Sequence, residues 1–347
     1  MDLHENKPNP EPIESTKIVE AFGLRKCPKL VEQCCSEALE VRVNALAVLC
    51  DEFRNPYSIY GCAEAGIIKV LARMVTDSDY ITRVRATRAL AIAAEDANGL
   101  GAILIDEAIS DIIQGLRDPA AEVRENVYLC FYHCSRTADG LEAVVNSGAI
   151  KAFARAVSVE SDSLKPIMLQ AIHNACSIQK GLQDSLDASA VKVCIQLLLH
   201  DSDAIAAEAA RTLGFLSFSE QGKEDALSND AIGSLVVLLN RTTDSKVQIS
   251  ATTALMAVTT TDEGKRQMLP SDGAPVLVGI LTSQKCEKSV KMNILKIISN
   301  IAVYPPIRMQ LKSTDKLLEA IRLMIASGDK FIEKHAKAAL DAVLWSP

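Results

Sequence analysis

The chain has 347 residues, of which 48% are hydrophobic but only 4% aromatic, a composition that suits helices packed closely on helices. Its formal net charge of −7 excludes a global basic field that could hold a nucleic-acid backbone or an anionic membrane. With no signal peptide, no lipidation motif and no apolar run of about 18 residues, we expect a soluble, cytoplasmic protein with reduced cysteines.

Residues 1–16 contain Pro8, Pro10 and Pro12 and show no apolar periodicity. Such a segment cannot pack as a helix or contribute a core. We therefore expect an extended Pro-rich arm at residues 1–16 and a single repeat domain at residues 17–347.

An apolar helical pattern returns about every 40 residues along the rest of the chain. Valine or an equivalent residue opens one helix of each unit, at Val41, Val84, Val123, Leu164, Ala207, Ile249, Val290 and Ile332. This period is typical of armadillo or HEAT solenoids, in which each unit buries its apolar face only by stacking on its neighbours. The pattern predicts an all-α, right-handed superhelical solenoid of about eight repeats, with third helices forming a concave face.

Each unit shows the same internal order of a short helix, a turn, a second helix, a polar turn and a longer third helix. Glycines at the first turn, Gly66, Gly148 and Gly273, predict positive φ there. Acidic residues before the third helices are predicted to cap them, at Asp79, Asp118 and Asp162. A basic residue follows the opening apolar position and is expected to pair with Asp or Glu of the same or the next repeat, at Arg42, Arg85, Arg124, Lys165 and Lys291.

Two columns of residues are expected to line the concave face. The first column reads Arg88, Val127, Gln170, Arg211, Thr253, Lys296 and Ala338, and the second reads Ile92, Phe131, Asn174, Phe215, Ala257, Asn300 and Ala342. Armadillo proteins resembling importin-alpha capture basic peptides with Trp in the first column and Asn in the second. This chain has no Trp in the first column, and its single tryptophan, Trp345, is expected to close the last core.

The basic side chains of the first column would repel a basic peptide, so an acidic or amphipathic protein partner suits this groove better. The predicted partner-binding residues are Arg88, Ile92, Phe131, Gln170, Asn174, Arg211, Phe215, Lys296 and Asn300.

The chain contains no phosphate-binding loop, nucleophile elbow or HExxH metal motif. Cys130, His133 and Cys134 form the most suggestive cluster, but a soft-metal site needs a further ligand, and buried structural cysteines are the favoured interpretation. We expect no catalytic residue, no cofactor and no metal, and therefore a protein that is not an enzyme.

Several short segments narrow the similarity to one family: 15–17, 21–23, 28–30, 42–51, 55–56, 67–79, 210–213 and 263–265. In order and spacing, they resemble the radial spoke armadillo proteins of motile cilia. The resemblance implies a non-catalytic structural scaffold in the ciliary or flagellar axoneme, in a hetero-oligomeric complex with other radial spoke proteins. The alternatives are a cytosolic armadillo adaptor or an assembly factor that binds acidic or helical peptides in its groove.

Overall fold

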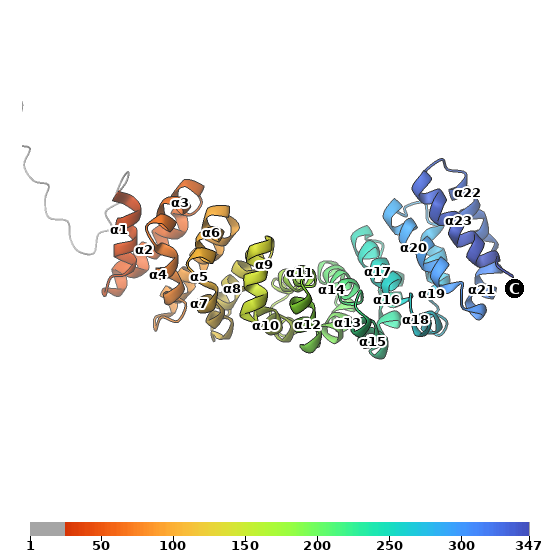
Figure 1. Ribbon diagram of the computed structural model, residues 1–347, viewed down its shortest axis with the longest axis horizontal. Helices are drawn as coiled ribbons and strands as arrows, with labels where there is room; N and C mark the ends of the chain where they lie inside the picture. The colour runs from red at the N-terminus through yellow and green to blue at the C-terminus, as the bar shows by residue number, and fades with distance from the viewer. Residues whose placement is uncertain (1–24, 347) are drawn as a thin grey trace, which may run out of the picture. The chain divides into compact units, whose positions relative to one another are not determined.

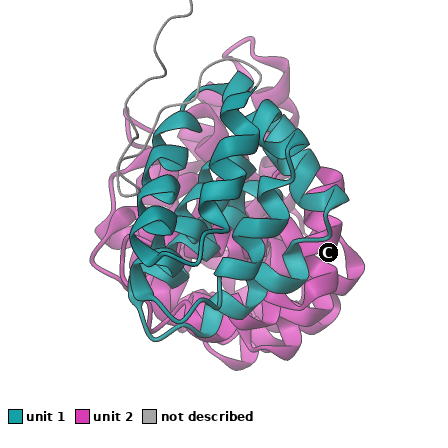
Figure 2. Cartoon of the chain, turned by 90° about the vertical axis from the view of Figure 1, so that its left-hand side faces the viewer, with its two compact units in different colours: residues 1–134 teal, residues 135–347 magenta. Residues whose placement is uncertain are grey.

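A computed structural model describes residues 25–346 of the chain, and within this range helices and turns are present without strands. The expected arm at residues 1–16 and the expected start of the repeats at residue 17 lie outside the described residues. The chain divides into two compact units, residues 1–134 and 135–347, which are coloured separately in Figure 2. Each unit is described by itself.

The first unit contains the helices at the red-to-yellow end of Figure 1. Its helices are α1 (Lys26–Cys34), α2 (Leu39–Glu52), α3 (Pro56–Glu64), α4 (Ile67–Met74), α5 (Tyr80–Glu95), α6 (Ala97–Ile105), α7 (Ile109–Ile112), the 3-10 helix Ile113–Arg117 and α8 (Ala121–Cys134). The third helices α2, α5 and α8 pack side by side in that order.

The second unit continues the same order through five further sets of three helices. They are α9 (Ala138–Ser147), α10 (Ala149–Ala156), α11 (Lys165–Ala175), α12 (Gln179–Asp187), α13 (Ala190–Leu198), α14 (Asp203–Leu216), α15 (Glu220–Ser228), α16 (Ala231–Arg241), α17 (Ser245–Val258), α18 (Asp262–Gln267), α19 (Gly273–Leu281), α20 (Lys288–Ile301), α21 (Pro305–Lys312), α22 (Asp315–Ile325) and α23 (Lys330–Leu344). The third helices α11, α14, α17, α20 and α23 again pack side by side.

The third helices supply the core because their apolar faces recur in register. In the second unit, Met168, Ala209, Ala251 and Ile294 are each 0% exposed, and their positions differ by 41 to 43 residues. Small and branched side chains at these positions let neighbouring helices approach closely, and each repeat thereby buries the face of the next.

Six successive turns between a first and a second helix, from α3–α4 to α18–α19, place one residue in the left-handed region. Gly66 and Gly148 adopt φ 82° there, as predicted. The equivalent residues of four other repeats are not glycine but have positive φ, at Glu107, Ser189, Asp230 and Asp272. The prediction for Gly273 was therefore wrong: Asp272 takes the left-handed conformation, and Gly273 begins α19, where a Cβ atom would overlap the side chain of Met268.

A second set of glycines, not singled out in the sequence, lies in the first turn of the first helices. A Cβ atom at Gly99, Gly181, Gly222 or Gly264 would overlap a backbone carbonyl oxygen at the end of the preceding third helix. The four positions, with Gly140 between the first two, recur every 41 or 42 residues. They allow the first helices that carry them to turn sharply off the third helix before them.

Of the three predicted acidic caps, Asp79 is the one whose hydrogen bond reaches an N–H inside its helix, because Ala120, the partner of Asp118, precedes α8. Asp79 accepts a hydrogen bond from the backbone N–H of Thr82 at 2.7 Å, and Asp118 accepts one from Ala120 at 2.8 Å. Asp162 is not a cap: α11 starts after Leu164, and the Asp162 carboxylate instead contacts Lys165 Nζ at 2.6 Å.

Among the basic residues predicted to follow the opening apolar position of the third helices, Arg42, Arg85 and Arg124 donate to backbone carbonyls. Arg42 Nη1 donates to Ser36 O at 3.0 Å and Arg124 Nη1 donates to Asp118 O at 2.9 Å, each six residues back in the chain. Arg42 also lies 3.7 Å from Asp77. The expected pairing with a carboxylate is confirmed for Arg42 and Lys165, and Arg124 also donates to carbonyls of the turn before its helix.

Hydrogen bonds also join successive third helices. In the first unit, Asn126 Nδ2 donates to Val84 O and to Thr87 Oγ1, both at 3.2 Å. In the second unit, Asn293 Nδ2 donates to Thr252 Oγ1 at 3.1 Å and to Thr253 Oγ1 at 3.0 Å. Because these partners are 39 to 42 residues apart in sequence, each such bond sets the position of one repeat on the next.

Trp345 does not close the last core as expected. Its side chain is 55% exposed, and the guanidinium carbon of Arg308 lies 4.7 Å from the ring centroid. The last third helix is closed instead by the small and branched residues Ala336, Ala339 and Val343, each 0% exposed.

Candidate functional site

The first-column residues of the second unit lie at equivalent positions on adjacent third helices. Gln170 on α11, Arg211 on α14 and Thr253 on α17 each stand two residues after a fully buried core position, namely Met168, Ala209 and Ala251. Side chains two residues from the core point away from it on a helix. We call the surface that these three helices present here the third-helix face.

The third-helix face contains a hollow of about 540 Å³. It is lined by Pro166, Gln170, Ala204, Ala207, Glu208, Arg211, Phe215, Lys246, Ile249, Ser250 and Thr253. The sequence-predicted residues Gln170, Arg211 and Phe215 therefore share one concave site, formed within a single unit.

Phe215, the aromatic residue that lines the hollow, belongs to a cluster of three rings. The ring of Phe215, 36% exposed, meets the ring of His173 edge-on at a centroid distance of 4.0 Å, and Phe218 lies 5.4 Å beyond Phe215. Burial, with a smaller contribution from the nearby Arg211 charge, lowers the pKa of His173 to about 4. His173 is therefore neutral near pH 7 and packs against Phe215 without adding charge beside the hollow.

The charged residues of the hollow are two cations and one carboxylate. Arg211 and Lys246 are exposed, whereas one carboxylate oxygen of Glu208, Oε2, is buried and has no hydrogen-bond partner. An incoming segment could present a carboxylate to Arg211 and Lys246 and place an apolar side chain against Phe215. A peptide N–H could donate to Glu208.

The other predicted residues of the second unit lie outside the hollow. Asn174 is half-buried and its Nδ2 donates to Ser135 Oγ at 3.1 Å, so it is partly engaged within the fold. Lys296 and Asn300 are half-buried on α20. In the first unit, Arg88 is exposed and Ile92 is half-buried on α5.

Phe131 was wrongly predicted to be a groove residue. Its side chain is 0% exposed, as is that of Val127 in the first column, because both face the core of α8. The core positions Ala86 and Leu90 of α5 precede them by 41 residues, so the residues equivalent to Arg88 and Ile92 are Leu129 and His133.

Glu208, Lys246 and Phe218 were missed by the sequence columns. Glu208 directly precedes a buried core residue of its third helix, as Asn126 and Asn293 do in theirs. Both asparagines donate hydrogen bonds to the preceding third helix. A column counted at this position would have included Glu208. Lys246 enters from the first turn of α17 and Phe218 from just beyond the end of α14. Columns drawn only along third helices miss such residues.

The cysteines of the described residues behave as packing residues. A hydrogen bond with Cys134 and burial raise the pKa of Cys130, and burial raises the pKa of Cys34 and Cys176 to about 12. Such thiols stay protonated near pH 7 and are poor nucleophiles and metal ligands. Residues 25–346 bring together no group of three or more His, Cys, Asp or Glu side chains suited to a metal ion.

None of the helices between residues 25 and 346 combines the length and apolar character needed to cross a membrane.

Comparison with known proteins confirms the fold class. An engineered protein of solved structure superposes with a TM-score of 0.83 at 23% identity, covering 93% of this chain and 79% of that one. A designed armadillo repeat protein superposes over 68% of this chain and 99% of its own with a TM-score of 0.60 at 18% identity. The chain is therefore an all-α repeat solenoid of the armadillo type.

At the sequence level, no family model matches the chain. A segment of 154 residues is 26% identical to radial spoke protein 14 of Chlamydomonas reinhardtii and covers 43% of this chain and 40% of that protein. This similarity agrees with the radial spoke resemblance seen in the sequence, over less than half of the relative's length.

Proposed function

We propose that this protein is a non-catalytic scaffold subunit of the radial spoke in the ciliary or flagellar axoneme. The observation that carries the proposal is the 154-residue similarity to radial spoke protein 14, on a chain whose fold is a repeat solenoid. A solenoid presents a long surface relative to its length and suits the simultaneous binding of several partners. Its partners would be other axonemal proteins.

The hollow on the third-helix face is the proposed partner site. Another designed armadillo repeat protein, similar to this chain at a TM-score of 0.60 and 19% identity, is in complex with the basic peptide (KR)4. Here Arg211 and Lys246 border the hollow and Phe215 lines it, so a basic peptide would meet like charge. The fitting partner segment carries an acidic residue next to an apolar one.

Localisation tests the axonemal role. In ciliated cells that express the protein, cilia are isolated, extracted with detergent and then with salt, and the fractions are probed for the tagged full-length chain. Retention in the extracted axoneme supports the proposal. Complete release with the detergent-soluble fraction would refute it and favour a cytosolic adaptor or assembly factor.

The Arg211→Glu/Phe215→Ala variant tests the partner site in the same assay. Both side chains are exposed, so the variant should keep its circular dichroism and melting temperature while its retention falls. Lys192→Glu, at an exposed position on the second helix α13, makes the same change of charge away from the hollow and should be retained like the wild type. Equal retention of all three proteins would remove the hollow from the proposal without affecting the axonemal role.

A further inference from the structure

The second helix α19 has an unusual composition for a helix at the surface of a solenoid. Its nine residues, GAPVLVGIL, include no charged or hydrogen-bonding side chain. Ala274, Leu277 and Leu281 face the core, but Val276, Val278 and Ile280 are only half-buried. Part of this apolar helix thus remains in contact with solvent.

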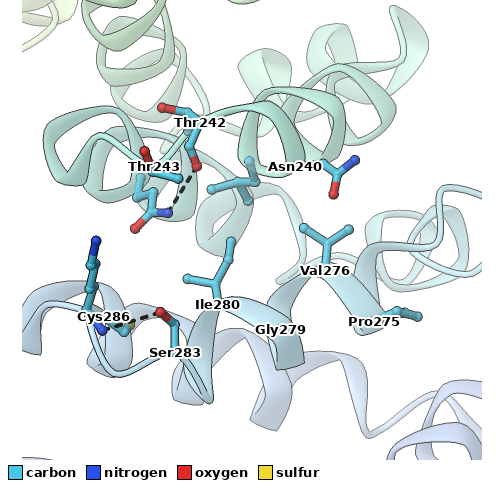
Figure 3. A pocket seen from close by; sticks show the side chains of 12 residues that line it. Asn240, Thr242, Thr243, Pro275, Val276, Gly279, Ile280, Ser283 and Cys286 are labelled. Atoms are coloured by element: carbon cyan, nitrogen blue, oxygen red, sulfur yellow. Dashed lines mark hydrogen bonds between the residues drawn. The ribbon is translucent and has the colours of Figure 1, made fainter.

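A hollow of about 450 Å³ lies on one side of α19. In Figure 3, Val276 and Ile280 face the segment from Asn240 to Thr243 across this hollow. Leu239 from α16 contributes further apolar surface, and Lys285 stands at the rim.

A second hollow of about 450 Å³ adjoins the first at Ser283, which lines both. Its lining combines six polar or charged residues with five apolar ones, Leu281, Ala320, Leu323, Met324 and Ile332. Leu323 on α22 is 66% exposed, a large apolar side chain left open to solvent at the edge of a concave site. We call the two adjoining hollows the α19 surface.

Lysines surround the α19 surface. Lys285 borders the first hollow and Lys291 and Lys316 border the second, where Glu319 is the one acidic neighbour in the lining. None of the three lysines forms an ion pair with any residue that the structure describes. An apolar site with unpaired cations at its rim complements an apolar ligand with flanking carboxylates.

The charge distribution along the sequence points the same way. Residues 271–347 contain 11 Lys and Arg against 7 Asp and Glu, whereas the whole chain contains 37 against 44. The last repeats are therefore basic within an acidic protein. An acidic ligand would be repelled by most of the chain and attracted to this part of it.

We propose that the α19 surface binds an acidic amphipathic helix of a partner protein. Apolar side chains one or two turns apart on that helix would enter the two hollows, and its Asp or Glu residues would meet Lys285, Lys291 and Lys316. The surface shares no lining residue with the hollow on the third-helix face, so it is a second docking site with its own test.

Two fluorescent synthetic helical peptides test the proposal on the full-length chain. Both carry leucines at positions i, i+4 and i+7, and their flanking residues are Glu in one and Lys in the other. By fluorescence anisotropy, the Glu peptide should bind at least about tenfold more tightly than the Lys peptide. Leu323→Asp should weaken binding of the Glu peptide by a similar factor, because it places a carboxylate in the apolar site.

Charge reversal provides the decisive comparison. Lys291→Glu/Lys316→Glu should invert the preference between the two peptides, while Lys192→Glu should leave it as in the wild type. Equal affinity for both peptides, no binding, or a preference unchanged by the reversal would overturn the proposal. A wild-type dimer in light scattering that the reversal dissociates would also overturn it, since the occupant would then be a second copy of the chain.

Discussion

Single residues with positive φ recur in six successive turns between a first and a second helix. Glycine occupies only two of the six positions, and Glu107, Ser189, Asp230 and Asp272 accept the left-handed conformation instead. For residues with a Cβ this conformation costs about 1–2 kcal/mol. The cost is accepted because the turn geometry is imposed by packing on both sides.

Replacing one of these residues with glycine should stabilise the protein. We expect Ser189→Gly to raise the free energy of unfolding by about 1 kcal/mol, because the Ser189 side chain makes no capping hydrogen bond that would be lost. The measurement is the shift in midpoint of thermal unfolding, which should move upward.

Asp230→Gly is the matched comparison for this prediction. The Asp230 side chain accepts a hydrogen bond from the backbone N–H of Gly233 at 3.3 Å, so relief of backbone strain is offset by loss of the cap. Its gain should be smaller than that of Ser189→Gly. A lower melting midpoint for Ser189→Gly than for the wild type would contradict the argument.

Among the helices, the first helices α6, α12, α15 and α18 begin with a close approach to the third helix before them. Gly99 in α6 lies against the carbonyl oxygen of Ala93. A Cβ atom at Gly101, two residues later, would have no neighbouring atom within 4 Å. The same helix thus offers one crowded and one open glycine. Only the crowded one is required by packing.

Gly99→Ala should destabilise the first unit by about 1–3 kcal/mol, because a backbone atom must move to admit the methyl group. Gly101→Ala should stabilise it by about 0.5–1 kcal/mol, as alanine does within a helix. Urea unfolding followed by circular dichroism measures both. Equal effects of the two substitutions would show that the close approach at Gly99 is not a constraint.

The order of helices could be predicted from the sequence because helical periodicity and turn residues are local signals. The register of individual helices could not. Thr82 takes the position in α5 that Val123 takes in α8, so the valine chosen in α5, Val84, lies two residues late. Two residues rotate a side chain by about 200° around a helix, which is why a count from these valines placed the buried Phe131 in the groove.

The candidate site was predictable only where its residues fall in the two columns counted along the third helices, as Gln170, Arg211 and Phe215 do. Arg211 and Phe215 lie one turn apart on α14 and were found together. Lys246 joins them from the first turn of the next third helix. The burial of Glu208 Oε2 depends on the conformation of the Glu208 side chain in the folded protein. Neither relation is encoded in the local sequence pattern.

For the whole molecule, a repeat architecture predicts that damage stays local. Each repeat contacts its neighbours, so stability is a sum of repeat and interface contributions. Gly99→Ala should therefore increase amide hydrogen exchange in α3, α5 and α6, which pack together, and leave α20 to α23 unchanged. Exchange measured by mass spectrometry that rises uniformly along the chain would show instead a single cooperative structure, and Gly101→Ala serves as the control.

The spacing of the hydrogen bonds between successive third helices also limits which insertions and deletions of residues this chain tolerates. Asn293 reaches Thr252 across 41 residues, and the left-handed residues Ser189 and Asp230 are also 41 residues apart. Deleting 41 residues joins equivalent positions of two repeats. The core face of the third helices and the left-handed turn residues then stay in register. Deleting half of that number would set a second helix where a third helix is needed. Insertions and deletions within the helices are thus tolerated only as whole repeats, which makes length a discrete property of this fold.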